Sequence, residues 1–185
     1  MSKTLFKEFV EQKKAVDTRI KSIDWLARKE FYLRQVEMLF KTVEEYLREF
    51  IESGDVQIET TLEKIEEDNL GEYLVPVLQI RLYGKQATLE PGGTNLIGTP
   101  GRVDLAGNFD SKRLVLAEKD ESRPQAGVAL PCSWMDEDEQ DESASQDLCP
   151  ACGYAWKFIT DPPKVRYIEL TEDSFLSALQ EVLDA

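Results

Sequence analysis

The chain has 185 residues, of which 42% are hydrophobic, and it carries a formal net charge of −14 with no histidine. Its length and composition are those of a globular domain that builds its core without a disulfide framework or a metal. Residues 1–55 hold eleven basic and eleven acidic residues, so residues 56–185 carry the whole excess, eleven basic against twenty-five acidic. Such a surface repels phosphate backbones and favours a protein partner, and the lack of histidine removes the usual general base at neutral pH.

Two N-terminal stretches, residues 3–20 and 24–52, are predicted to be amphipathic helices because their apolar residues recur at steps of three and four. Ser22 or Asp24 can cap the second helix, and Gly54 is suited to end it in the left-handed conformation. The apolar stripes fit packing against a sheet, and they fit equally the seam of a homo-oligomer formed through the N-terminal helices. The first stripe consists of Leu5, Phe6, Phe9, Val10, Val16 and Ile20, and the second of Leu33, Val36, Leu39, Phe40, Val43, Tyr46, Leu47, Phe50 and Ile51.

From Val56 onward the apolar pattern alternates with a period of two, which predicts strands. The stretch 56–65 is the first strand, and 72–91 reads as two strands joined tightly at Tyr83-Gly84-Lys85, with Pro76 at an edge or a bulge. The Gly-rich stretch 91–101 lacks the Gly-Lys-Ser/Thr of a nucleotide-binding loop and is predicted to be a long connection. RVDLAG and KRLVLAEK form a second predicted hairpin around Gly107 and Asn108.

The last third of the chain is predicted to add short strands and a final helix. The stretches AGVALP, YAWKFI and VRYIEL read as strands, and residues 136–147 between the first two carry seven acids and no base, which is typical of a solvated loop. The final helix, 172–184, begins after Thr171 as its cap, and Leu170 is placed to contact Phe175.

The predicted fold is therefore α+β. An N-terminal helical region (1–54) precedes an antiparallel β-rich region (55–185), which contains a ribbon-like hairpin insert at about 126–160 and the C-terminal helix. Sequential strands joined by short turns favour an antiparallel sheet, and the two regions are expected to form one compact domain.

The insert contains Cys149-Pro-Ala-Cys152 followed by Gly153, a spacing typical of a zinc knuckle. The partner knuckle would be Cys132-Ser-Trp-Met135, where a methionine occupies the position of the fourth ligand. Cys132, Cys149 and Cys152 are therefore candidate ligands of a structural zinc ion that an acidic side chain or water completes. In the alternative interpretation, the knuckle is a metal-free turn between two strands.

The stretch GRVDLAGNFDSKRLVLAEKD, residues 101–120, resembles the core hairpin of the PD-(D/E)xK nucleases. In that family an Asp on one strand and a Glu-x-Lys on the next bind Mg²⁺ and activate water. The resemblance implies Asp104, Glu118 and Lys119 as the catalytic residues. Glu118 and Lys119 are adjacent here, however, whereas the family places the two residues two positions apart, on the same face of the strand.

Three cysteines, an odd number with two of them in a Cys-x-x-Cys spacing, indicate a reducing compartment, and we expect a cytoplasmic protein. The N-terminus shows no signal-peptide pattern, and no stretch approaches the roughly 20 apolar residues of a membrane span. The favoured hypothesis is a non-catalytic accessory or inhibitory subunit that recognises a protein partner through its acidic surface. The alternatives are a metal-dependent nuclease-like enzyme, and a zinc-ribbon module that associates with nucleic acid or mimics it.

Overall fold

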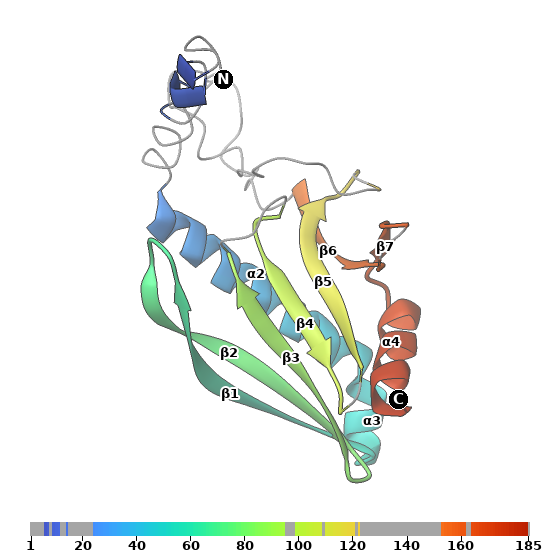
Figure 1. Ribbon diagram of the computed structural model, residues 1–185. Coiled ribbons are helices and arrows are strands. Elements are labelled where there is room, and N and C mark those ends of the chain that lie inside the picture. The colour runs from blue at the N-terminus through green and yellow to red at the C-terminus, as the bar shows by residue number, and fades with distance from the viewer. Residues whose placement is uncertain are drawn as a thin grey trace, which may run out of the picture.

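The computed structural model describes residues 24–94, 99–108, 110–120, 153–161 and 164–184, together with single residues between 6 and 14 and Ser122. This part of the chain is α+β (Figure 1). The helices are α2 (Trp25–Tyr46), α3 (Arg48–Ser53) and α4 (Glu172–Asp184). The strands are β1 (Val56–Glu67), β2 (Gly71–Leu82), β3 (Lys85–Gly93), β4 (Arg102–Ala106), β5 (Ser111–Glu118), β6 (Tyr154–Ile159) and β7 (Tyr167–Glu169).

The second predicted helix is present but divided. Asp24 caps α2, because its carboxylate accepts a hydrogen bond from the Ala27 N–H at 2.9 Å. The helix ends at Leu47, whose backbone (φ −95°, ψ 0°) separates it from the short helix α3. Gly54 then ends α3 in the left-handed conformation, with φ at 83°, as the sequence predicts.

The strands form one antiparallel sheet of seven strands, whose order in space is their order in the chain. The turn at Tyr83 and Gly84 joins β2 to β3, and β4 and β5 form the second predicted hairpin. Pro76 lies in the part of β2 that pairs with β1 alone, because β3 pairs only with residues 78–82 of β2. The predicted strand AGVALP lies outside the described residues.

The core lies between α2 and one face of the sheet. Figure 1 shows α2 crossing that face from the tip of the β1–β2 hairpin to α3. The inner face of α2 is closely packed, since Tyr32, Val36, Leu39 and Val43 are at most 1% exposed. They pack against buried strand residues that include Leu78, Ile80, Leu89, Val103, Leu105, Leu114 and Leu116.

A buried polar cluster joins the tip of the β1–β2 hairpin to the beginning of α2. The carboxylate of Glu67 accepts hydrogen bonds from the Thr94 N–H at 2.6 Å and from the Tyr73 hydroxyl. The guanidinium of Arg28, a residue only 2% exposed, donates to the Thr94 carbonyl at 2.5 Å. Tyr32 donates to the Arg102 carbonyl at 2.7 Å and accepts from the Gly93 N–H at 3.0 Å. These bonds satisfy polar groups that would be costly to bury unpaired.

The helix α4 packs against the ends of the inner strands β3, β4 and β5, where the turn between β4 and β5 approaches it. A Cβ at Gly107 would lie 1.9 Å from the Val182 carbonyl oxygen, so only glycine permits this approach. Phe175 and Val182 are buried, and the Lys112 ammonium lies 2.7 Å from the Glu181 carboxylate. Within the described part of the chain, every helix is too short or too polar to span a lipid bilayer.

Gly107→Ala tests whether this close approach holds α4 in place. We expect the free energy of unfolding to fall by about 1–3 kcal/mol, because an added methyl group cannot fit without moving α4 or the turn. Urea denaturation followed by circular dichroism measures this change. Gly153→Ala is the matched control, since no atom lies within 4 Å of its Cβ position. Equal stability of the two variants would contradict the packing described here.

Candidate functional site

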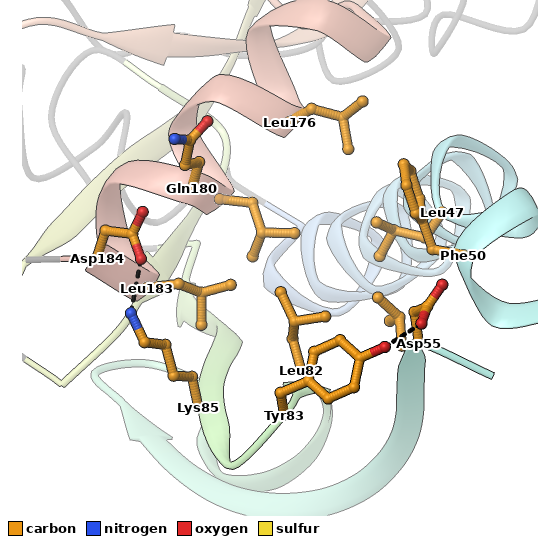
Figure 2. A pocket seen from close by; sticks show the side chains of 12 residues that line it. Leu47, Phe50, Asp55, Leu82, Tyr83, Lys85, Leu176, Gln180, Leu183 and Asp184 are labelled. Atoms are coloured by element: carbon orange, nitrogen blue, oxygen red, sulfur yellow. Dashed lines mark hydrogen bonds and ion pairs between the residues drawn. The ribbon is translucent and has the colours of Figure 1, made fainter. Parts of the chain in front are cut away.

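An apolar groove of about 610 Å³ lies where α3, α4 and the turn between β2 and β3 meet. Its floor is formed by Leu47, Val56 and Leu179, which are at most 6% exposed. In Figure 2, Leu176 and Leu183 of α4 face Leu47, Phe50 and Leu82 across the groove. Apolar side chains thus surround a space of the size that small ligands or the side chains of a partner occupy.

Two local features of the sequence create this groove. In α4, Phe175 and Val182 enter the core, whereas Leu176 and Leu183, seven residues apart, lie on the neighbouring stripe and stay partly exposed. Two helical turns separate positions seven apart, so both leucines line the same side of the groove. The break at Leu47 separates α3 from α2, and Phe50 of α3 remains 39% exposed at the groove wall.

Polar and charged side chains form the rim. The Lys85 ammonium at the start of β3 lies 2.6 Å from the Asp184 carboxylate at the end of α4 (Figure 2). On the other side, the Tyr83 hydroxyl donates to Asp55, which also accepts from the Ser53 hydroxyl at 2.5 Å. The hydrogen bonds from Ser53 and Tyr83 lower the pKa of Asp55, and that from Lys85 lowers the pKa of Asp184. Both rim carboxylates are therefore anionic at neutral pH.

The acidic character extends along both helical walls. The helix α4 contains Glu172, Asp173, Glu181 and Asp184 and no lysine or arginine. From residue 48 to 55 the other wall carries three acids and one arginine. An apolar groove between two acidic walls attracts a ligand that combines apolar and positively charged groups.

Tyr83 occupies a strained position at the rim. Its φ is 46° and that of Gly84 is 83°, the pair of positive values that a two-residue hairpin turn requires. Asn-Gly is the usual sequence there, because a tyrosine adopts positive φ only at an energetic cost. The side chain is nevertheless 83% exposed. The turn thus presents an exposed aromatic ring beside the groove at a cost in backbone strain.

The structure does not bring the predicted nuclease residues together. Asp104 lies on β4 opposite Arg113, and it also receives hydrogen bonds from the Arg102 guanidinium at 2.9 Å. Glu118 is five positions beyond Arg113 on β5, roughly 16 Å along the strand. Asp104 shares a face with its partner Arg113, and Glu118 lies an odd number of positions from Arg113. Asp104 and Glu118 therefore point to opposite faces of the sheet. Lys119 follows the strand, and its carbonyl accepts from the buried Lys157 ammonium at 2.6 Å.

Cys132, Cys149 and Cys152, the predicted zinc ligands, lie outside the described residues. The two ends of the stretch that contains them are neighbours, because Glu118 pairs with Tyr154 and the Lys119 N–H donates to the Gly153 carbonyl at 2.9 Å. The chain therefore leaves the sheet at Lys119 and returns to it at Gly153 at one place. Among the described residues, no group of three or more Cys, Asp or Glu side chains is placed to hold a metal ion.

Sequence reasoning missed the groove, although two signals for it are present. The first is the pair Leu176 and Leu183, which makes the apolar stripe of α4 wider than one buried face requires. The second is a tyrosine in front of Gly84, in a tight turn where Asn or Gly is expected.

Comparisons of the chain with protein-family models, with curated proteins and with solved structures find no match.

Tyr83→Asn tests whether the rim tyrosine is retained at a cost to stability. We expect the urea midpoint of unfolding to rise, because asparagine adopts positive φ more readily than tyrosine and the exposed hydroxyl contributes little. Tyr83→Val is the opposite control, and its midpoint should fall because a β-branched residue strongly disfavours positive φ. A lower midpoint for Tyr83→Asn would show that the tyrosine is there for stability.

Proposed function

We propose that this protein is a non-catalytic cytoplasmic binding protein whose groove receives a basic, amphipathic segment of a protein partner. The observation that carries the proposal is the apolar groove between two acidic walls. It supports the general hypothesis drawn from the sequence, an accessory or inhibitory subunit that recognises a protein partner through an acidic surface.

The shape of the groove fits a helical segment. Leu176 and Leu183 line one side over two helical turns, and Phe50 and Leu82 line the other. An amphipathic helix presents apolar side chains at positions i, i+4 and i+7, the spacing that such a groove accommodates. Burying these side chains supplies most of the binding free energy, and a few aromatic or aliphatic anchors dominate it.

The charge of the groove favours basic partners and disfavours nucleic acid. Acids outnumber bases on both walls, and the ammonium of Lys85 at the rim is already paired with Asp184. A lysine or arginine of the partner would find Asp55 and Asp184 at the rim of the groove, whereas a phosphate would be repelled.

The protonation of the rim supports binding rather than proton transfer. A general acid or base works best with a pKa near the working pH. Hydrogen bonding lowers the pKa of Asp55 and Asp184, and the bond to Asp55 raises the pKa of Tyr83. All three shifts move the pKa values further from neutral pH, so these groups keep one protonation state and are suited to fixed electrostatic roles.

The proposal predicts that the groove binds a model helix of leucine and lysine. Fluorescence anisotropy with a labelled Leu/Lys peptide should show binding that Phe50→Ser weakens at least about tenfold, because an exposed aromatic anchor is lost. Lys85→Gln should strengthen binding, because it frees Asp184 for a lysine of the peptide. A Ser/Lys peptide of equal charge and a Leu/Glu peptide should both bind weakly to every variant.

Leu74→Ser is the matched control, because Leu74 is an exposed leucine (57%) on the β1–β2 hairpin and does not line the groove. It removes a surface apolar side chain without a change of charge, as Phe50→Ser does. Equal binding by the two variants would show that the peptide adheres to the acidic surface in general, and the proposal would fail.

A structural zinc ion held by Cys132, Cys149 and Cys152 remains part of the proposal, as a brace for the insert between β5 and β6. Metal analysis of the purified protein should find one zinc ion per chain, and Cys149→Ser should remove it because a structural site needs its thiolate ligands. Peptide binding at the groove should persist in that variant. Zinc-free protein with unchanged stability would favour the metal-free turn.

A further inference from the structure

The long strand β1 forms an open edge of the sheet. It has twelve residues and stands first in the strand order, so it pairs with β2 on one side only (Figure 1). The strand at the opposite edge, β7, has three residues. The exposed side chains of β1 are those of Gln57, Glu59, Thr60, Leu62, Glu63, Lys64 and Glu66. An edge of this length directs a row of backbone N–H and C=O groups outwards, where a further strand can pair with them.

A second pocket, of about 450 Å³, lies beside this edge and is called the edge pocket here. All of its described lining residues belong to α2, α3 and β1, which places it on the free side of β1 rather than between β1 and β2. Ile51 and Ile58 are half-buried and form its apolar floor. The exposed charged residues around them are Lys41, Glu44, Glu45, Arg48 and Glu52. A strand added beside β1 would direct the side chain next to Ile58 to the same face, and hence into this pocket.

The side chains along β1 alternate between apolar and acidic. Ile58 and Leu62 lie on one face of the strand, because successive side chains point to opposite faces. Glu59 and Glu63 lie on the other face. Glu59 is 2.9 Å from the Arg81 guanidinium of β2, whereas Glu63 forms no ion pair within the described part of the chain. The edge is therefore complementary to an extended segment in which apolar residues alternate with basic residues.

The charge of β1 also decides against a second copy of this chain as the added strand. Residues 56–67 contain four glutamates and one lysine. Pairing two such strands would gather acidic side chains on neighbouring strands, and like charges in that arrangement are destabilising. Charged edge residues protect a sheet from pairing with its own copies in this way. A segment of opposite charge from another protein meets no such repulsion.

We propose that the outer edge of β1 binds an extended, basic segment of a partner protein as an additional strand of the sheet. An apolar side chain of that segment enters the edge pocket above Ile51 and Ile58. Its lysines or arginines lie beside Glu59 and Glu63. The inference goes beyond the proposed function of the groove, because α3 separates the two surfaces: Phe50 lines the groove and Ile51 lines the edge pocket.

A labelled ten-residue peptide of alternating valine and lysine tests the inference by fluorescence anisotropy. Binding to the native chain should be weakened at least about threefold by Glu63→Lys, because an attraction becomes a repulsion. Leu62→Ser should also weaken it, because an apolar contact on the exposed edge is lost. Glu118→Lys is the matched control for charge, since Glu118 is an exposed glutamate of β5, and it should bind more tightly than Glu63→Lys does. A peptide of alternating valine and glutamate should not bind.

Methylation of the peptide backbone distinguishes strand addition from adhesion by charge. In an added strand, every second residue directs its N–H to the neighbouring strand, so these groups come from the valines alone or from the lysines alone. N-methylation of one of the two sets should weaken binding at least about tenfold, and N-methylation of the other set should leave it nearly unchanged. Equal affinities of the two methylated peptides, equal binding by Glu63→Lys and Glu118→Lys, or no binding to the native chain would each overturn the inference.

The groove variant separates this inference from the proposed function. Phe50→Ser should leave binding of the Val/Lys peptide unchanged, and Glu63→Lys should affect the Leu/Lys peptide no more than Glu118→Lys does. If Phe50→Ser weakens binding of the Val/Lys peptide, that peptide occupies the groove and the edge site is wrong. If Phe50→Ser leaves the Leu/Lys peptide unaffected while Glu63→Lys weakens the Val/Lys peptide, the proposed function of the groove fails and the edge site stands.

Discussion

The packing of one helix across the sheet determines how the rest of the molecule is arranged. Because the face of α2 that carries Tyr32, Val36, Leu39 and Val43 is buried against the sheet, the helix holds a fixed direction, and its two ends meet different surroundings. Its N-terminal end lies among the polar groups of Arg28, Glu67 and Thr94, whose mutual hydrogen bonds make their burial tolerable. Its C-terminal end meets α3 and α4, where side chains are apolar and space remains. The groove is therefore a consequence of where α2 stops and α4 is held.

The same arrangement places the closest contacts and the proposed binding groove at opposite ends of α2. The polar end is specified by close contacts that permit few alternatives: a Cβ at Gly93 would lie 2.6 Å from the Glu67 carboxylate, and one at Gly101 would lie 2.5 Å from the Tyr32 ring. Burial also raises the pKa of Tyr32, which keeps its hydroxyl protonated as a donor. At the groove end, by contrast, Tyr83 is strained and Phe50 and Leu176 are incompletely covered. Incomplete burial at the groove end is compatible with the fold, because the close contacts at the polar end specify how α2 packs on the sheet.

The periodicity of the apolar residues predicted most of the described helices and strands. The step of three and four predicted a single helix over residues 24–52, where the structure has α2 and α3. The alternation after Val56 and the glycine at position 84 predicted the first hairpins, because each is a local property of the chain. The break at Leu47 was not foreseen, since no proline or glycine marks it. The groove, by contrast, depends on contacts between residues that are far apart in the sequence. Nothing local shows that Leu183 faces Leu82, and only the register shows that Asp104 and Glu118 lie on opposite faces.

Because the strand order in space is the order in the chain, each described strand from β2 onward finds its partner in the strand before it. Neighbours joined by short turns, such as β2 with β3 and β4 with β5, close small loops and lose little chain entropy on pairing. The sheet can accordingly grow by successive additions from β1 as the polypeptide emerges during synthesis. Docking of α4 comes last on this route, so the groove is completed only when the C-terminal helix has been made.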